Sequence, residues 1–426
     1  MSGPRVILVL PLFILSITMP PTAAAQAPDA ALAHARALLR STPLIDGHND
    51  LPWEIRRAEG HPRDVAAYDL RTRAPKHTDL ERLKQGQVAA QFWSLYIDGE
   101  MKDSGYARVQ LEQFDIARRM IARYPDRLAL ALTAGDIERD VKRGRLASLL
   151  GMEGGHAIEN SLGALRSYYT LGARYMTLTH NVTLDWADAA LDSARHGGLT
   201  EFGREVVREM NRLGMLVDLS HASPAVMSNA LDVSEAPVIF SHSAARALVD
   251  HGRNVPDSIL ARLPGNGGVV MVTFVPQFVS NEFKAWQETA DAARKELGSA
   301  VADSGEQRPR MEDWEALHPA PSATLEQVAD HIEHVRKVAG VDHVGIGSDF
   351  DGIDHVPVGL EDVSRFPDLF AELIRRGWSD VDLKQLAGQN LLRVLRQAEA
   401  TAARLQRTRE PSTRTIEELD LGKSTS

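Results

Sequence analysis

The sequence contains no cysteine, and this absence excludes three kinds of chemistry. A chain without thiols has no cysteine nucleophile, no cysteine-ligated zinc site and no disulfide bond. Basic residues are not in excess either, because 48 Lys and Arg stand against 58 Asp and Glu, which gives a net charge of −10. Proteins that bind nucleic acid neutralise phosphates with a basic surface, so nucleic acid is not an expected partner.

Two common hydrolase motifs are also absent. The sequence has no H-E-x-x-H segment, which argues against a thermolysin-type zinc site. It has no G-x-S-x-G segment either, so a serine hydrolase elbow is unsupported.

Long hydrophobic runs are scarce, and the one exception lies at the N-terminus. A single charged residue precedes Asp29, Val6–Met19 is almost wholly apolar, and Ala23–Ala25 offers a small-residue cleavage site. This order predicts a secretory signal peptide over residues 1–25. A membrane anchor is the alternative, but the run is short for a bilayer span and Pro11 interrupts it.

The remaining chain predicts one exported domain. No later segment is apolar and long enough to span a bilayer, and residues 407–426 lack the apolar tail of a lipid-anchor signal. An exported chain without cysteine fits a bacterial periplasm or exterior, where disulfides are less general than on eukaryotic cell surfaces. We therefore expect a periplasmic or secreted protein with a domain over residues 26–400 and a polar C-terminal tail over 401–426.

Eight short apolar runs predict buried parallel strands, because they are rich in Val, Ile and Leu on both faces. The runs are Leu44–Asp46, Val88–Leu95, Leu146–Met152, Tyr175–Thr179, Met215–Leu219, Val238–Phe240, Gly268–Phe274 and His343–Gly347. Amphipathic stretches such as Tyr106–Tyr124, Glu201–Leu213 and Leu325–Val338 lie between them. Eight strands with crossover helices predict the α/β class and a closed (β/α)8 barrel of the TIM type.

Two segments of the chain leave alternatives open, and two others have a single expected structure. A ninth apolar run, Leu128–Leu132, is either an extra strand or the start of a helix. Asp98–Gly105 is expected to be a loop. The stretch Val275–Ala323 is far longer than a normal connection, so we expect an insertion after the seventh strand that is a lid, an extra helical pair or an oligomer contact. The chain from Gln397 onward is expected to end a helix and continue as a loose tail.

Titratable residues follow six of the eight predicted strands, and this is the most informative feature of the sequence. They are His48 and Asp50, Glu153, His180, His221, His242 and Asp349. Active sites of (β/α) barrels lie at the carboxyl ends of the strands, where all of these residues would meet. In an extended chain His48 and Asp50 point the same way and could hold one ion.

The cost of burial favours a metal site over a structural role. Burying many ionisable groups in one mouth costs several kcal/mol each unless they are paired or bind metal. Imidazoles and carboxylates are ligands of zinc or, less specifically, of manganese or cobalt. His331 and His334, three residues apart on a predicted helix, are a weaker candidate pair that we expect on the solvated face.

Seven motifs give the chain a resemblance to the membrane dipeptidase (renal dipeptidase) family of zinc peptidases, within the amidohydrolase barrel superfamily. They are DGHNDLPW at Asp46–Trp53, GMEGGHAIE at Gly151–Glu159, TLTHN at Thr177–Asn181, DLSHAS at Asp218–Ser223, FSHSAARAL at Phe240–Leu248, GRNVPD at Gly252–Asp257 and GIGSDFDG at Gly345–Gly352. Their order along most of the mature chain makes the resemblance specific.

The resemblance implies a role for each site residue. His48 and Asp50 would hold one zinc ion, His221 and His242 a second, and Glu153 would bridge both. His180 would contact the substrate carbonyl oxygen, Arg253 the substrate carboxylate, and Asp349 would be the catalytic acid and base. Asp351 points the same way as Asp349 in an extended chain and is the competing assignment. The lack of cysteine puts a disulfide-linked dimer in doubt, while a homodimer stays open.

The expected function is a zinc-dependent dipeptidase that hydrolyses free dipeptides through a hydroxide bridging two ions, with acceptance of a C-terminal D-residue left open. The alternative is a barrel amidohydrolase acting on another small amide or lactone, such as an N-acyl amino acid. The H-x-D of the first strand and the glutamate bridge favour the dipeptidase. A third hypothesis, an exported binding protein without catalysis, is disfavoured because every expected ligand is present.

Overall fold

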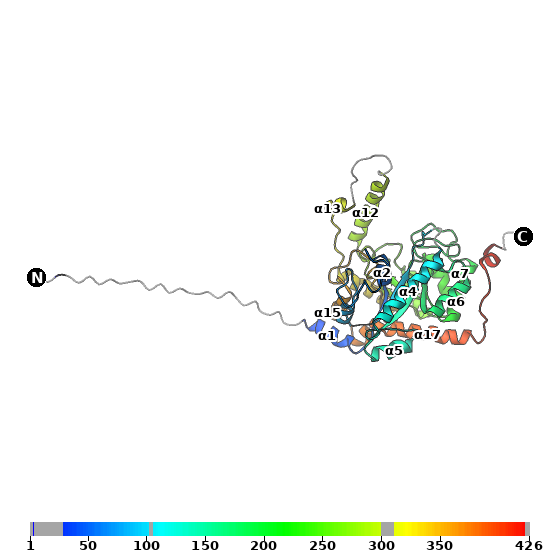
Figure 1. The fold of residues 1–426 in the computed structure, drawn as a ribbon, viewed down its shortest axis with the longest axis horizontal. Helices are drawn as coiled ribbons and strands as arrows, with labels where there is room; N and C mark the ends of the chain where they lie inside the picture. The colour runs from blue at the N-terminus through cyan, green and yellow to red at the C-terminus, as the bar shows by residue number, and fades with distance from the viewer. Residues whose placement is uncertain (1–2, 4–28, 102–104, 300–310, 422–426) are drawn as a thin grey trace.

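The structure is a computed structural model that describes residue 3 and residues 29–101, 105–299 and 311–421. The predicted signal peptide, residues 1–25, lies outside the described residues except for residue 3. In the described chain nine parallel strands form one sheet. Helices surround the sheet (Figure 1). The strands are β1 Leu44–Asn49, β2 Val88–Tyr96, β3 Leu128–Leu130, β4 Leu146–Glu153, β5 Ala173–Thr177, β6 Leu216–Asp218, β7 Ile239–Ser243, β8 Val269–Val272 and β9 Val344–Ile346.

Eight of these strands close into a barrel, and the predicted (β/α)8 fold is confirmed. β1 pairs with β2 on one side and with β9 on the other, where Asp46 lies opposite Ile346. β2 then pairs with β4 and brings Tyr96 opposite Glu153. Because β4 to β9 pair in chain order and all pairs are parallel, every carboxyl end lies at the same mouth.

The ninth apolar run forms an extra strand, β3, which decides between the two alternatives for Leu128–Leu132. Leu128 pairs with Leu146 at the start of β4. One side of β4 pairs with β2. On its other side β4 pairs with β5 only from Leu150 onward, so β3 pairs with the part of β4 that comes before Leu150. It adds to the wall near the N-terminal ends of the strands and does not enter the ring.

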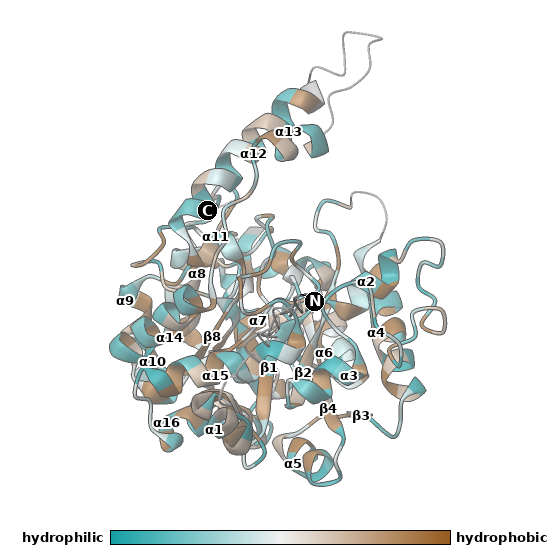
Figure 2. Ribbon diagram, turned by 90° about the vertical axis from the view of Figure 1, so that its left-hand side faces the viewer, coloured by the Kyte–Doolittle hydropathy of each residue, from teal (hydrophilic) through white to brown (hydrophobic). Residues whose placement is uncertain are grey.

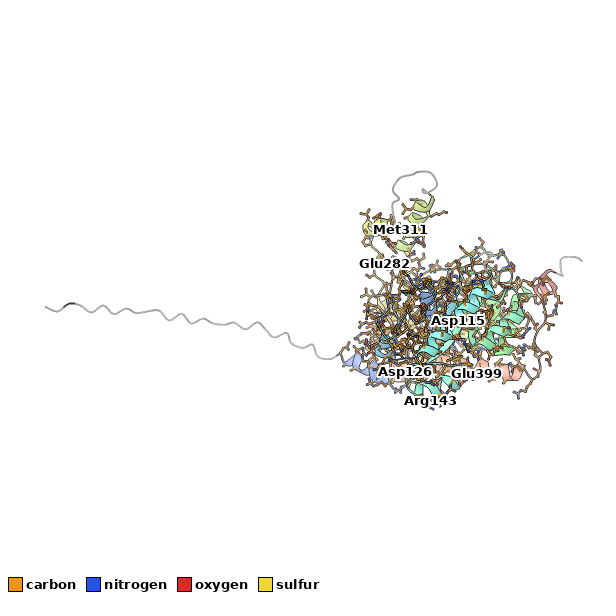
Figure 3. All side chains as sticks on the ribbon, in the orientation of Figure 1. Asp115, Asp126, Arg143, Glu282, Met311 and Glu399 are labelled. Atoms are coloured by element: carbon orange, nitrogen blue, oxygen red, sulfur yellow. The ribbon has the colours of Figure 1, made fainter. Side chains whose placement is uncertain are left out.

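Helices cover the outside of the barrel and precede or follow the strands. They are α1 Ala30–Leu39, α2 Leu51–Arg57, α3 Leu80–Gln85, α4 Tyr106–Arg123, α5 Ala134–Lys142, α6 Leu162–Leu171, α7 Glu201–Leu213, α8 Pro224–Val233, α9 Asp257–Leu260, α10 Leu263–Asn266, α11 Pro276–Val279, α12 Asn281–Ser299, α13 Met311–Leu317, α14 Leu325–Ala339, α15 Phe366–Arg375, α16 Asp380–Lys384 and α17 Asn390–Leu405. The pattern that predicts them is amphipathic: in α4, Phe114 is buried while Asp115 lies on the outer surface (Figure 3). None of the described helices has the length and apolar character that a bilayer crossing needs.

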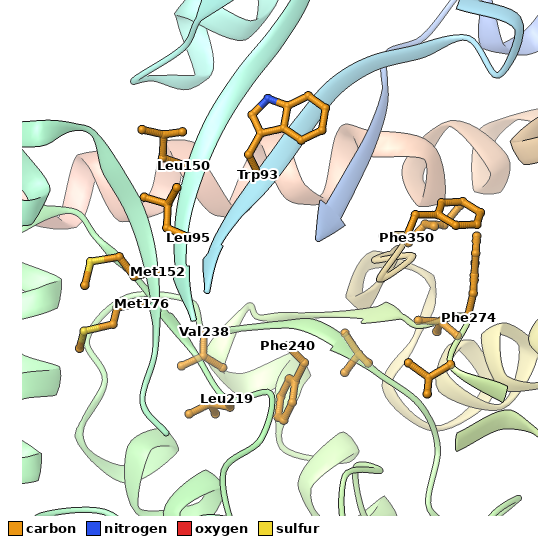
Figure 4. Close-up of a cluster of buried hydrophobic side chains, with 14 of the residues drawn as sticks. Trp93, Leu95, Leu150, Met152, Met176, Leu219, Val238, Phe240, Phe274 and Phe350 are labelled. Atoms are coloured by element: carbon orange, nitrogen blue, oxygen red, sulfur yellow. The ribbon is translucent and has the colours of Figure 1, made fainter. Parts of the chain in front are cut away.

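The strands direct apolar side chains into two layers. Ile45, Phe92, Leu149, Tyr175 and Met271 fill the inside of the barrel, and α17 closes its lower end with further apolar residues. The alternate residues, including the labelled Trp93, Leu95, Leu150 and Met152, pack between the strands and the helices (Figure 4). Because the interior is filled, polar side chains at the carboxyl ends rest on a packed floor.

The insertion after β8 contains a helical pair, one of the three alternatives for Val275–Ala323. α12 and α13 project away from the barrel (Figure 2). The two helices contact each other through Trp286 of α12 and Trp314 of α13, whose ring centroids are 6.2 Å apart. Trp286 Nε1 also donates a hydrogen bond to the carbonyl of His318 at 2.7 Å. Phe283 at the base of α12 packs against His355, which follows β9.

Two expectations about the outer layer are wrong. His331 is buried, not solvated, because its Nδ1 accepts a hydrogen bond from Ala245 N at 3.0 Å and so holds α14 against the chain after β7. The chain after α17 is not loose within the described residues. Arg166 donates to the carbonyl of Ser412 at 2.9 Å, and Ser412 N donates to Glu209 in α7 at 3.4 Å.

Candidate metal centre

A cavity of about 310 Å³ opens at the carboxyl ends of the strands. Each of the eight barrel strands or the loop after it contributes to its lining. The predicted residues that line it are Asp50, Glu153, His180, His221, His242, Arg253 and Asp349. His48 lies fully buried against this group. The fold therefore brings all eight predicted site residues to one place.

Two pairs of side chains converge in this cavity. His48 Nε2 lies 3.2 Å from Asp50 Oδ2, and His221 Nε2 lies 2.9 Å from His242 Nε2. His48 lies within β1, but Asp50 turns out of the strand with φ −94° and ψ 21° as α2 begins. The two residues therefore meet through a turn and not through the alternation of an extended strand.

Glu153 lies between the two pairs. Its Oε2 is 3.4 Å from His48 Nε2. Its other oxygen, Oε1, is 3.0 Å from His221 Nε2 and 3.5 Å from His242 Nε2. Ser94 Oγ donates to Oε2 at 3.0 Å and fixes the orientation of the carboxylate. Oε2 of Glu153 thus faces the first pair, and Oε1 faces the second pair.

A hydrogen bond at the other ring nitrogen orients each of these histidines. The pairs are His48 Nδ1 with the Tyr175 hydroxyl, His221 Nδ1 with Asn181 Oδ1, and His242 Nδ1 with Ser241 Oγ, each 2.9 Å apart. Histidines that bind metal are commonly held in this way, because a partner at one nitrogen directs the lone pair of the other nitrogen to the ion.

The arrangement fits divalent metal ions. His221 Nδ1 donates to the amide oxygen of Asn181. His242 Nδ1 donates to Ser241 Oγ, whose own hydrogen goes to Asp218 Oδ2. Both Nε2 atoms therefore present lone pairs, yet they are 2.9 Å apart. Lone pairs at that distance repel unless a cation lies between them. Two nitrogens bound to one tetrahedral zinc ion at about 2.0–2.1 Å are about 3.3 Å apart, close to the separation of these two atoms. His48 Nε2 is also buried and has no hydrogen-bond partner among the described residues.

The electrostatics give Glu153, His221 and His242 the protonation states of metal ligands. Burial opposes ionisation of Glu153, but His48 and His221 outweigh it and hold the pKa of the carboxyl well below its usual range. Burial lowers the pKa of His221 well below its ordinary value, and Arg253 adds to this effect. The pKa of His242 is lowered in the same direction, mainly by burial. Metal ligation uses these forms, an ionised carboxylate and neutral imidazoles. His48 differs, because burial lowers its pKa but Tyr175, Glu153 and Asp50 outweigh burial and raise it well above its ordinary value, so this ring would release a proton on binding an ion.

His180 and Arg253 lie beside the ligand cluster. His180 Nε2 is 3.8 Å from Glu153 Oε1, and the ring packs 4.8 Å from that of Tyr96. The Arg253 guanidinium is buried over the Phe278 ring, 5.2 Å from its centroid. Its Nη1 has no hydrogen-bond partner among the described residues, and burial lowers its pKa to about 10. A buried cation with a free donor is suited to an anion in the cavity.

The two candidate acids after β9 differ in their surroundings. Asp349 Oδ1 is 3.9 Å from His48 Nε2, and burial raises the pKa of this carboxyl well above its usual range. Asp351 Oδ1 accepts a hydrogen bond from His77 N at 2.8 Å, so that oxygen is held outside the ligand cluster. Both residues have positive φ, 68° and 67°, which is strained backbone of the kind found at active sites. The geometry favours Asp349 over Asp351.

Sequence reasoning missed the residues that orient the histidines. Tyr175 looks like an apolar position of a buried strand, yet its hydroxyl reaches His48 in a different strand. The glycine at position 151, within a predicted strand, was a sign in the sequence that a large side chain lies against this strand. A Cβ at Gly151 would lie 2.0 Å from the Tyr175 ring. Only glycine leaves room for that ring beneath the cavity. Ser94 and Ser241 gave no comparable signal, since serines in strands are common.

Comparison with known proteins identifies related sequences. A family model described as membrane dipeptidase (peptidase family M19) matches residues 32–409. Dipeptidase verJ of Clonostachys rogersoniana is 42% identical over 393 residues, which cover 90% of this chain and 91% of its own length. Dipeptidase 3 of Mus musculus is 43% identical over 371 residues, which cover 86% of this chain and 66% of the mouse protein.

Solved structures share the fold. The probable dipeptidase PvdM of Pseudomonas aeruginosa superposes with a TM-score of 0.75 at 25% identity, covering 88% of this chain and 100% of PvdM. Dipeptidase AC, a metallopeptidase, gives 0.70 at 26% identity over 84% of this chain and 98% of its own. A metallopeptidase from Rhodobacter sphaeroides, solved with a phosphinate mimic of L-Ala-D-Ala, gives 0.68 at 24% identity over 84% of this chain and 99% of its own.

Proposed function

The chain belongs to the membrane dipeptidase family, peptidase family M19, and on that premise we propose that it is an exported dinuclear zinc dipeptidase acting on free dipeptides. The single observation that carries the proposal is the position of Glu153. Its two oxygens face two separate ligand pairs, and a carboxylate so placed can bridge two ions.

The same geometry supports an assignment of the metal ligands. Two groups of potential ligand atoms within 4.8 Å of one another, His48 with Glu153 and His242, and Glu153 with His180 and His221, share Glu153. His48 and Asp50 would hold one ion, His221 and His242 the other, and Glu153 both. The second position has more nitrogen ligands, which suits zinc, and manganese or cobalt could substitute. When bound, two such ions supply a water of lowered pKa and polarise the scissile carbonyl.

The neighbouring residues supply the proton transfers and the charge stabilisation. Asp349 would take a proton from the attacking water and give it to the leaving nitrogen, and its raised pKa suits a group that must hold that proton. His180 Nε2 lies 3.8 Å from Glu153 Oε1, and from there it could donate to the developing oxyanion. Burial lowers the pKa of His180, so the ring is neutral and keeps one donor.

Arg253 would select a substrate with a free carboxylate. Its planar fork pairs with a carboxylate in two parallel hydrogen bonds, and the free Nη1 is available for one of them. A cavity of about 310 Å³ is small for a ligand site, which suits a dipeptide better than a longer chain.

A substrate panel with metal analysis tests the function. Free dipeptides, their N-acylated forms and their C-amidated forms would be compared at equal concentration on enzyme of measured zinc content. We expect two zinc ions per chain and much faster hydrolysis of the free dipeptides than of either blocked form. Equal rates on N-acylated compounds would instead support the alternative, an amidohydrolase of small amides such as N-acyl amino acids.

The same panel addresses the stereochemistry of the second residue. We propose that a D-residue at that position is accepted, as the Rhodobacter sphaeroides relative binds a mimic of L-Ala-D-Ala. L-Ala-D-Ala and L-Ala-L-Ala are therefore paired substrates. Turnover of the L,L form alone would reject this part of the proposal.

Export is proposed from the N-terminal sequence. The apolar run Val6–Met19 followed by Ala23–Ala25 has the order of a signal peptide. Mass spectrometry of the protein expressed from the full gene in a bacterial host is expected to give a mature chain beginning at Gln26 in the periplasm. An uncleaved chain in the membrane fraction would support the anchor instead.

A further inference from the structure

Asp218, at the end of β6, is a buried carboxylate that has no part in the proposed reaction. It is fully buried, and four donors surround it. Oδ1 accepts from Ser220 N at 3.1 Å and from Ser241 N at 2.8 Å. Oδ2 accepts from Thr177 Oγ1 and from Ser241 Oγ, each at 2.6 Å. An ionised carboxylate offers about four acceptor sites, and here all of them are used.

This network determines the direction of the next hydrogen bond. Since an ionised carboxylate only accepts, the single hydroxyl hydrogen of Ser241 points to Asp218. Ser241 Oγ must then accept from His242 Nδ1, which lies 2.9 Å away. With its hydrogen on Nδ1, His242 directs the Nε2 lone pair toward His221 and Glu153. A carboxylate outside the cavity thus decides which tautomer His242 adopts.

Two other buried contacts of the barrel resemble this network, but neither fixes the tautomer of a histidine. His48 Nδ1 meets the Tyr175 hydroxyl, which can donate or accept and so leaves the tautomer open. Asp46 in β1 is buried in the same manner, with Ser348 Oγ donating to its Oδ2 at 2.7 Å. Among the described residues Ser348 Oγ has no hydrogen bond with a histidine ring; its other partners are the backbone carbonyl of His48 and the backbone N–H of Phe350.

We propose that Asp218 is a positioning residue that fixes the His242 tautomer through Ser241 and thereby sets the affinity of the metal position formed by His221 and His242. The inference rests on the proposed dinuclear site and adds to it a difference between the two positions. Loss of Asp218 affects one ion, because only one of the two ligand pairs is connected to it.

The first test is Asp218→Asn. The amide N–H that replaces Oδ2 donates to Ser241 Oγ, whose hydrogen then turns to His242 Nδ1 and moves the ring hydrogen to Nε2. We expect one of the two zinc ions to bind about 10–100-fold more weakly, the usual effect of losing a partner behind a metal ligand, and the other to be unchanged. Competition of the full-length zinc-loaded protein with a chromophoric chelator measures both affinities.

Thr177→Val is the matched control. It removes the other hydroxyl donor from the same oxygen of Asp218 and keeps the link from Ser241 to His242. Both ions are expected to keep wild-type affinity in this variant. Ser241→Ala is a second variant that removes the acceptor of His242 Nδ1 and keeps the carboxylate. Because Asp218 and Ser241 act in series, the double variant should weaken the same ion no further than either single change.

Three results would overturn the inference. The first is wild-type zinc affinity at both positions in Ser241→Ala and in Asp218→Asn, provided that the latter folds. The second is an equal loss of affinity for both ions in these variants, and the third is that Thr177→Val weakens zinc binding as much as they do. The proposed function fails separately, because a wild-type protein that binds fewer than two ions or leaves dipeptides intact contradicts the dinuclear dipeptidase whatever the variants do.

Discussion

Glu153 lies where the two ligand pairs meet, so a change at this residue affects both. Glu153→Gln replaces one oxygen with an amide nitrogen that cannot ligate a metal ion. We expect the metal content to fall below two ions per chain and turnover to fall about 100-fold or more. Elemental analysis and the dipeptide assay measure the two effects.

Glu209→Gln is the control for this change. Glu209 is also a buried glutamate, but it pairs with Arg212 and Arg166 on the outside of the barrel. We expect it to lower stability and leave the metal content at the wild-type value. Retention of both ions by Glu153→Gln would mean that the bridging role is assigned to the wrong residue.

Arg253 is expected to act on substrate binding alone. Loss of a buried charge partner costs about 2 kcal/mol or more, so Arg253→Ala should raise KM for free dipeptides about 30-fold and leave the zinc content intact. A C-amidated dipeptide lacks the carboxylate, so on that substrate the wild type and the variant should differ little. If the difference persists on the amide, Arg253 does not bind the carboxylate.

At the scale of elements, the helical pair α12 and α13 is attached to the barrel at one end. Phe283 is buried at its base and packs 5.2 Å from the Trp286 ring and 5.3 Å from the His355 ring. Phe283→Ala removes about 3 kcal/mol of packing at that point. We expect faster amide hydrogen exchange in α12 and α13 and unchanged exchange in the barrel strands.

Leu317→Ala is the control within the same pair, because Leu317 is 79% exposed and little packing is lost. Hydrogen exchange should match that of the wild type. Faster exchange throughout the barrel in Phe283→Ala would show that the pair is part of the barrel's own cooperative unit.

At the scale of the whole molecule, buried histidines make stability depend on pH. Burial lowers the pKa of His331 to about 4, against about 6.5 in an unfolded chain. The unfolded chain therefore binds a proton that the folded chain excludes between pH 6.5 and 4. The free energy of unfolding falls as pH drops through this window, and the effect is absent above it.

His331→Gln tests this dependence, because glutamine can accept from Ala245 N without titrating. Between pH 7 and 5 the variant should lose about 2 kcal/mol less unfolding free energy than the wild type. Urea unfolding in chelator, which removes metal effects, measures it. His34→Gln changes a solvent-exposed histidine and is the control, so its unfolding free energy should depend on pH as that of the wild type does. The same pH dependence in His331→Gln as in the wild type would contradict the prediction.

The sequence by itself determined the barrel and which titratable residues gather at its mouth. Strands and helices are local structures, and the spacing of apolar residues along the chain predicts them. Short apolar runs indicate the strands, and amphipathic stretches between them indicate the helices. Glu153, His221 and His242 could be named because each directly follows or ends such a run. Carboxyl ends of parallel strands meet at one mouth, so the position in the chain already implied the position in space.

Only the tertiary structure decided the contacts that join distant strands. The pairing of Tyr175 with His48, 127 residues apart, depends on how the ring closes, and no local pattern encodes it. The same holds for the burial of His331, whose partner Ala245 is 86 residues away. The preference for Asp349 over Asp351 depends on His77, 274 residues from Asp351 in the chain, whose N–H donates to Asp351 Oδ1. Periodicity fixes which face of an element is apolar, whereas the partners of polar atoms are set by packing across the fold.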